Sequence, residues 1–255
     1  MSMQINAIAL VALLTGTLAC AEASAGDFLS RQLSKSRVRA AWADQGADVK
    51  AMFADAGATW PPSDLFVRAF KTEGELELWA GTGKPNAKLV KVHTFPICAA
   101  SGDLGPKIRQ GDGQVPEGFY VINRFNPRSS YHLSLGLDYP NAVDKARTRT
   151  QSRGRSPGGD IFIHGSCVTI GCMPLTDGPM ERLYLAAIHA RGNGQRRVPV
   201  HVFPCRFGTK RCQRAMAEHP ALNAFWMGLR PGFDAFERTG RPPRVTAKRS
   251  GYHLR

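Results

Sequence analysis

Apolar and polar residues alternate in several short runs through the middle of the chain. The runs Leu65–Phe70 and Glu75–Ala80 lie on either side of Thr72-Glu73-Gly74, an arrangement typical of a β-hairpin. Further runs rich in β-forming residues predict strands at residues 89–97, 118–123, 131–137, 160–163 and 198–203. The central part of the chain, residues 64–204, is therefore expected to be a mostly β domain.

Helical spacing is found at the two ends of the chain and once inside it. Residues 26–63 carry a rough apolar stripe and end at Trp60-Pro61-Pro62, so we expect an N-terminal helical segment there. Asp177 is expected to be the N-cap of a helix that contains an early proline and runs to about Ala190. After Cys205, a helical face is formed by Leu222, Phe225, Trp226 and Leu229. Residues 205–255 thus read as a helical extension followed by an irregular basic tail. The pattern as a whole predicts an α+β fold, mostly β, with peripheral helices.

The first 25 residues resemble a secretory signal peptide. An apolar run from Ala7 to Leu14 precedes two small-x-small cleavage patterns that end at Ala23 and Ala25, although no Lys or Arg comes before the run. The run is too short for a typical membrane span. Lipidation at Cys20 is the weaker alternative, because Thr17-Leu18-Ala19-Cys20 matches the lipoprotein pattern poorly. We therefore expect export to a periplasm or cell envelope.

Charge narrows the choice of partner. The 255-residue chain carries a formal charge of +14, which becomes +15 if cleavage after Ala25 removes Glu22. An exported protein this basic suggests an anionic polymer such as a cell wall. Nucleic acid is the competing partner, but export and the absence of a basic stripe interleaved with aromatic residues argue against it. The densest basic run, residues 145–155, lacks periodicity and is expected to form a solvated loop bordering a cleft.

An imidazole and a thiol lie eight residues apart in the segment 161–173. The predicted strand delivers His164 at its end, and Cys172 follows Gly171 after a turn. A neighbouring imidazolium can lower a thiol pKa by several units from about 8.5 and so produce a nucleophilic thiolate. Two other interpretations remain open at this point: ordinary packing of the pair, and zinc bound by His164, Cys167 and Cys172, for which no fourth ligand stands at an ordinary spacing.

Five cysteines remain if Cys20 is removed with a signal peptide. Cys205 and Cys212 flank a short polar loop that a disulfide would close easily. If Cys98 also pairs with Cys167, Cys172 is left as the single free thiol. The spacing does not decide this second pairing, and reduced, buried Cys98 and Cys167 are the alternative.

Two motifs resemble the L,D-transpeptidase catalytic-domain family. His164-Gly165 followed by Thr169-Ile170-Gly171-Cys172 is similar to its active-site element, and residues 95–102 and 110–122 are similar to its upstream strand and x-Pro-x-Gly-x-Tyr-x-Ile arrangement. The resemblance covers roughly residues 64–204. Two departures are that Ile170 stands where the family usually has a second His, and Pro174 where it usually has an Arg. The shorter His-to-Cys spacing is similar to a compact-motif branch, some of whose members hydrolyse a peptidoglycan linkage.

The resemblance implies a β-sandwich or barrel catalytic domain that acts on peptidoglycan stem peptides without a metal or cofactor. Cys172 would form a thioester, and His164 would hold the thiolate as an ion pair and then protonate the leaving amine. The Gly165 carbonyl would orient the imidazole, and the N–H groups of Gly171 and Cys172 would face the oxyanion. His132 and Tyr131 are candidate substrate-binding residues. Crosslinking or protein attachment is the expected outcome; an amidase or peptidase that cleaves such bonds, including a link to a wall-attached lipoprotein, is the alternative.

Overall fold

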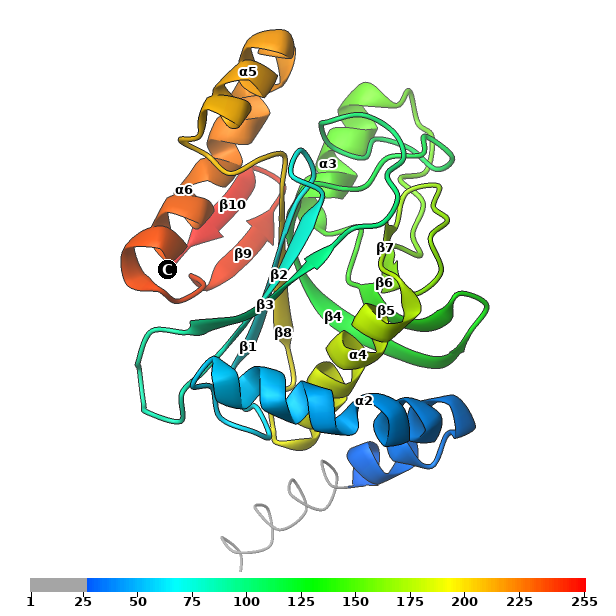
Figure 1. Cartoon of the computed structure of the whole chain (residues 1–255). Coiled ribbons are helices and arrows are strands. Elements are labelled where there is room, and N and C mark those ends of the chain that lie inside the picture. The colour runs from blue at the N-terminus through cyan, green and yellow to red at the C-terminus, as the bar shows by residue number, and fades with distance from the viewer. Residues whose placement is uncertain (1–26) are drawn as a thin grey trace, which may run out of the picture.

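The structure, a computed structural model, describes residues 27–255 and is built around one curled eight-stranded sheet (Figure 1). The expected signal peptide and Cys20 lie outside the described residues. The strand order is β3-β2-β1-β8-β4-β5-β6-β7. Their bounds are β1 Leu65–Phe70, β2 Glu75–Ala80, β3 Val90–Pro96, β4 Gly118–Ser129, β5 His132–Leu137, β6 Phe162–His164, β7 Met173–Pro174 and β8 Val198–Phe203.

The curl of the sheet brings its two edges toward each other. Strands β1 and β2 form the expected antiparallel hairpin, while β8 joins β1 in parallel and β4 in antiparallel pairing. Just beyond β3, the Cys98 N–H donates to the carbonyl of Pro174 in β7 at 3.0 Å. The sheet is thus nearly closed at the end where the candidate site lies.

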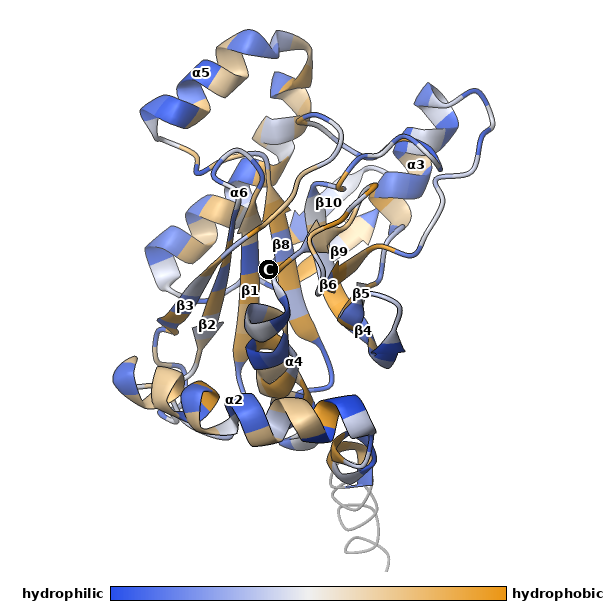
Figure 2. Ribbon diagram, turned by 45° about the vertical axis from the view of Figure 1, so that its right-hand side comes forward, coloured by the Kyte–Doolittle hydropathy of each residue, from blue (hydrophilic) through white to orange (hydrophobic). Residues whose placement is uncertain are grey.

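Helices α2 (Ser36–Asp55) and α4 (Asp177–Gly192) pack side by side against one face of the sheet (Figure 1). Helix α2 buries Val38, Val49 and Phe53, and α4 is apolar around most of its circumference because it lies between α2 and the sheet. Residues 27–33 form a further short helix whose apolar side chains pack on the same core. Figure 2 shows the apolar residues concentrated on the central strands and on the helix faces turned toward them.

A second core covers the opposite face of the sheet. It is formed by the C-terminal elements α5 (Lys210–Glu218), η1 (Pro220–Leu222) and α6 (Asn223–Thr239). Trp226 and Leu229 of α6 are buried, and the predicted helical face does pack, with Leu222 and Phe225 at its margin. Burying large aromatic and aliphatic side chains in this way contributes about 1.5–3 kcal/mol each.

Two sequence-based expectations about the basic segments are wrong. The run expected to be a solvated loop forms helix α3 (Ala142–Gln151), because Asn141 and Asp144 make a reciprocal capping box that starts the helix despite its lack of apolar periodicity. The tail expected to be irregular forms the hairpin β9 (Val245–Lys248) and β10 (Gly251–Leu254). The α+β class with helices at the periphery is confirmed.

Candidate active site

His164 and Cys172 are brought to the same face of the sheet by two short parallel strands. His164 is the last residue of β6 and pairs with Pro174 of β7, while Ile163 pairs with Met173. Extending this register by one residue sets Cys172 opposite Phe162. Side chains alternate along a strand, so Phe162 and His164 share one face, and the thiol emerges on that face too. The Cys172 Sγ lies 3.7 Å from the carbonyl oxygen of Asp160.

The imidazole of His164 is buried and fixed in one orientation. Its Nδ1 lies 2.6 Å from the carbonyl oxygen of Gly165, and because a carbonyl only accepts, Nδ1 carries the proton. The ring of Tyr131 lies over the imidazole, with centroids 4.8 Å apart and an angle of 31° between the planes. In the neutral ring, the Nε2 lone pair is therefore left to accept a proton.

Gly165 is confined by groups from two other elements. A Cβ added there would lie 2.6 Å from Asp177 Oδ1 and 2.8 Å from the Cβ of His132. Asp177 Oδ1 also accepts the N–H of Ser166 at 2.9 Å. The glycine thus allows α4 to approach the carbonyl that holds His164.

Asp177 is not the N-cap of α4, as the sequence analysis expected. The helix begins at Asp177 itself, and the capping position is occupied by Thr176, whose side chain makes no capping hydrogen bond. The carboxylate of Asp177 is instead directed at the loop after His164. The sequence pattern does not predict this contact because it joins residues on two different elements.

His132 is held by contacts with α4 and with Arg37 from α2. Its Nε2 lies 2.7 Å from Glu181 Oε1 in α4, and its carbonyl accepts a hydrogen bond from Arg37. Tyr131, by contrast, is about half exposed and covers His164. The structure therefore brings Tyr131 to the imidazole and ties His132 to the helix.

The Gly171-Cys172 turn is organised by Thr169, which the sequence analysis did not single out. The Thr169 hydroxyl accepts the N–H groups of Gly171 at 3.1 Å and Cys172 at 2.8 Å and donates to the Cys172 carbonyl at 2.9 Å. Gly171 has φ +134°, and a Cβ there would lie 3.0 Å from the Gln114 carbonyl oxygen. Both N–H groups expected to face an oxyanion are thus engaged by Thr169 in this structure.

Two disulfides leave Cys172 as the free thiol among the described residues. Cys98 pairs with Cys167 and Cys205 with Cys212, which confirms both pairings. The first ties the loop between His164 and Cys172 to the segment after β3. Because its sulfur is in this disulfide, Cys167 is not available as the zinc ligand considered above. Residues 27–255 contain no cluster of three or more His, Cys, Asp or Glu able to hold a metal ion.

A cavity of about 500 Å³ opens beside Cys172. One wall is the segment 97–104, which includes Cys98 and Ser101, and Lys71, the residue after β1, lines another part. Lys71 Nζ is 3.2 Å from Glu117 Oε1 and donates to the carbonyls of Asp103 and Val115. Burial lowers the pKa of Lys71 despite the nearby carboxylate. The Lys71 ammonium group therefore links the segments that contain Asp103 and Val115 beside the cavity.

Burial moves the pKa values of both candidate catalytic groups toward their uncharged forms. It raises the pKa of the Cys172 thiol, and it lowers the pKa of His164 against the opposing effect of the Gly165 hydrogen bond. The free protein thus favours a neutral thiol and a neutral imidazole. This differs from the ion pair that the sequence analysis expected.

Residues 70–202 match the sequence profile described as the L,D-transpeptidase catalytic domain (YkuD). The chain is also 34% identical over 192 residues to "Putative L,D-transpeptidase YafK" of Escherichia coli (strain K12), covering 74% of this chain and 73% of that protein. The chain belongs to the L,D-transpeptidase family. This membership supports a peptidoglycan-related enzyme.

Solved structures resemble this L,D-transpeptidase-family protein more distantly. The helical cell shape determining protein Pgp2 from Campylobacter jejuni is 19% identical with a TM-score of 0.43, over 78% of this chain and 79% of that chain. A single-residue variant of Pgp2 is 23% identical with a TM-score of 0.41, over 62% of this chain and 55% of that chain. Within residues 27–255, no helix has the length and apolar character needed to cross a membrane.

Proposed function

We propose that the protein transfers acyl groups between peptidoglycan stem peptides through a thioester on Cys172. The observation that carries this proposal is the free, half-buried Cys172 beside a cavity, on the same sheet face as a histidine whose Nδ1 proton is fixed. Such an arrangement suits a thiol activated by a base that is itself oriented by a third group.

The reaction begins from the neutral pair. His164 Nε2 takes the thiol proton as Cys172 Sγ bonds to the carbonyl carbon of a stem-peptide amide. The resulting imidazolium returns this proton to the amine as the C–N bond breaks, which leaves a thioester. An amine or water then attacks the thioester carbonyl, giving its proton to His164, and the thiol is restored.

The acceptor decides the outcome. An amine acceptor gives a new crosslink or attaches a protein, while water gives net hydrolysis of a peptidoglycan bond or of a link to a wall lipoprotein. Hydrolysis is the second candidate because the cavity beside Cys172, at about 500 Å³, is large enough to admit water as well as a peptide amine. Both outcomes use the same two residues. We place the reaction in the cell envelope, given the signal-like residues 1–25.

The proposal is tested by incubating the purified protein with isolated peptidoglycan and separating the released muropeptides by mass. Transpeptidation predicts new crosslinked species, and hydrolysis predicts the loss of existing links. Cys172→Ala and His164→Ala should each abolish either change, while His253→Ala, which alters an exposed histidine, should not. An unchanged muropeptide profile with the wild-type protein, or full activity in Cys172→Ala, would refute the proposal.

A further inference from the structure

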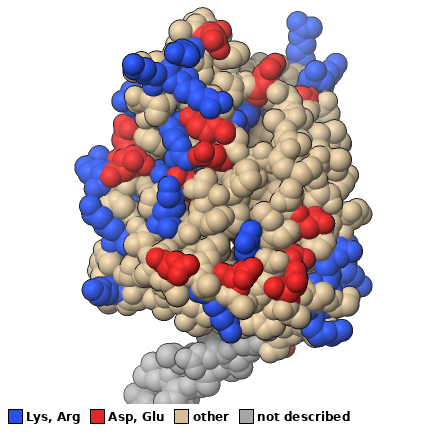
Figure 3. All heavy atoms as spheres, in the orientation of Figure 1, with Lys and Arg blue, Asp and Glu red and all other residues tan. Residues whose placement is uncertain are grey.

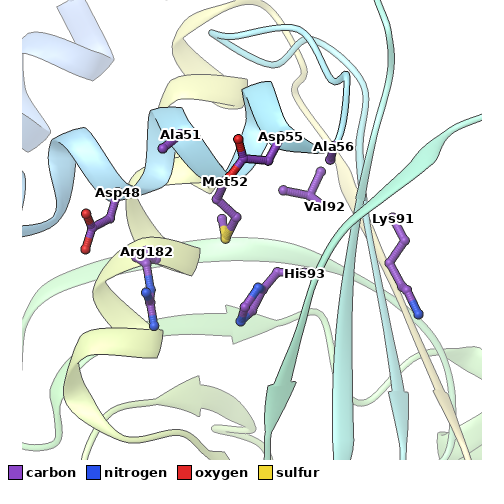
Figure 4. Close-up of a pocket in the computed structure, with 9 residues that line it drawn as sticks. All are labelled: Asp48, Ala51, Met52, Asp55, Ala56, Lys91, Val92, His93 and Arg182. Carbon is purple, nitrogen blue, oxygen red and sulfur yellow. The ribbon is translucent and has the colours of Figure 1, made fainter.

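A second pocket lies between α2, β3 and α4 and shares no lining residue with the Cys172 cavity. Its volume is about 470 Å³ (Figure 4). Apolar side chains from α2 and β3, mainly Met52 and Val92, line part of it. The remaining lining is charged or titratable and comes from all three elements. The pocket therefore combines an apolar surface with ionic groups of both signs.

The basic side of this pocket holds an unused hydrogen-bond donor. The Nε of Arg182 in α4 is buried and has no hydrogen-bond partner among the described residues. Figure 4 shows the Arg182 and His93 side chains extending beside each other into the space between α4 and β3. Burial and then the Arg182 charge lower the pKa of His93. An unpartnered buried donor of this kind is costly and is typically matched by an acceptor.

The acidic side comes from α2. Asp48 and Asp55 lie seven residues apart on this helix and both line the pocket. Within residues 27–255, neither aspartate forms an ion pair, and neither does Arg182; Lys91 has a distant partner, Glu77, at 3.8 Å. With His93 neutral, two carboxylates balance two cations, so the pocket carries no net charge.

A ligand with one sign of charge would suit only half of these groups. A carboxylate could accept hydrogen bonds from Arg182 and His93, and the exposed Asp48 at the pocket rim could accept a hydrogen bond from an ammonium group on the same ligand. An ammonium group alone would leave the buried Arg182 Nε unsatisfied. We propose that this pocket binds the zwitterionic head group of an amino acid or short peptide, with its carboxylate on Arg182 and His93, its ammonium on Asp48 and its apolar side chain on Met52. This inference does not depend on the proposed acyl transfer.

The test titrates the purified protein with alanyl-alanine while NMR follows the His93 ring and the Arg182 side chain. Two capped probes, N-acetyl-alanyl-alanine and alanyl-alanine amide, each lack one charge and should bind at least tenfold more weakly. Comparing the affinity for free alanine with that for alanyl-alanine shows whether the pocket prefers an amino acid or a short peptide. Signals from the Cys172 cavity should stay unshifted.

Variants assign each charge to its partner. Arg182→Gln should weaken the N-acetyl probe about tenfold and leave the amide probe unaffected, and Asp48→Asn should do the reverse. Arg191→Gln, on the same helix but outside the pocket, is the matched control. If Arg182→Gln fails to fold, Arg182→Lys and Asp48→Asn still provide the comparison. Equal affinity for all three peptides, or no shift at His93 at saturating probe, would overturn the proposal.

Discussion

At the scale of single residues, burial determines the protonation states of Cys172 and His164 more than attraction between the two side chains does. The same desolvation raises the pKa of Cys172 and lowers that of His164, so both favour the neutral state. The hydrogen bond to Gly165 selects the tautomer that can accept the thiol proton. For the proposed acyl transfer, these pKa shifts favour a role for His164 as a general base over a role as the counter-ion of a resting thiolate.

This description predicts how Cys172 reacts with iodoacetamide as pH changes. The alkylation rate should rise about tenfold per pH unit from pH 7 upward, with its midpoint above 9, because the thiolate is the reactive form and burial raises the thiol pKa above its ordinary value. His164→Ala should change this profile little. Peptide mapping should find the label on Cys172. A rate that is already constant below pH 7 would instead reveal a thiolate–imidazolium pair.

His201 gives a separate prediction about acid stability. It is fully buried against Phe66, Phe119 and Phe203, and burial, with a smaller effect of Arg68, lowers its pKa to about 3. The unfolded chain protonates this histidine below about pH 6.5 while the folded chain does not. The free energy of unfolding should therefore fall as pH drops from 6.5 to 3, by as much as about 5 kcal/mol from this group.

His201→Phe should remove that part of the acid sensitivity, since phenylalanine has no proton to gain. Urea unfolding at a series of pH values measures it, and the exposed His253→Phe serves as the control. Parallel stability curves for wild type and His201→Phe across this range would show that His201 is not the source.

The two central residues could be found from the sequence, whereas their supports could not. His164 and Cys172 stand at a strand end and a Gly-Cys turn, both visible as local patterns. Asp177 and Glu181 act on the site from α4, and only the packing of that helix against β5 and β6 reveals it. Thr169 did leave a local signal, because a hydroxyl two and three residues before two backbone N–H groups commonly bonds to them.

At the scale of elements, strand patterns were informative because period-two alternation is local. Helix α3 was missed because its start depends on a capping box, Asn141-x-x-Asp144, and not on apolar spacing. The β9–β10 hairpin was missed because only part of its surface packs: Val245 and Tyr252 rest on α6 and its core. The local sequence of the basic tail does not reveal that α6 provides this packing surface.

The disulfide between Cys98 and Cys167 should matter most among the covalent links. It spans 69 residues and anchors the loop carrying the Gly171-Cys172 turn, whereas Cys205 and Cys212 are only 7 apart. In the chain-entropy account, Cys98→Ser with Cys167→Ser should lower the free energy of unfolding by about 4 kcal/mol, and Cys205→Ser with Cys212→Ser by about 2. Turnover should fall strongly in the first pair alone. Equal losses of activity in both pairs would argue against the anchoring role.

At the scale of the whole molecule, the sequence carries a formal charge of +14. On the face drawn in Figure 3, Lys and Arg are prominent over the C-terminal helices α5 and α6, where some acidic side chains lie among them, and further acidic side chains lie lower down. Such a surface attracts an anionic polymer at long range, and salt screens this attraction over about 10 Å at 0.1 M.

Raising the salt concentration should therefore weaken binding to purified sacculi severalfold, as measured by sedimentation. The turnover of a small uncharged amide or thioester analogue should change much less over the same series, because it depends on the local site. Sacculus binding that does not change with salt would show that the basic surface does not bind the wall polymer by charge.

The central claim is that Cys172 carries an acyl group from a stem peptide. Rapid acid quenching of the protein during turnover of a purified stem peptide, followed by intact-mass and peptide-level mass spectrometry, tests it most directly. We predict a mass increase equal to the acyl fragment, located on Cys172, reversed by hydroxylamine and absent in Cys172→Ala. Turnover with no adduct on Cys172, or with the acyl group on another residue, would contradict the claim.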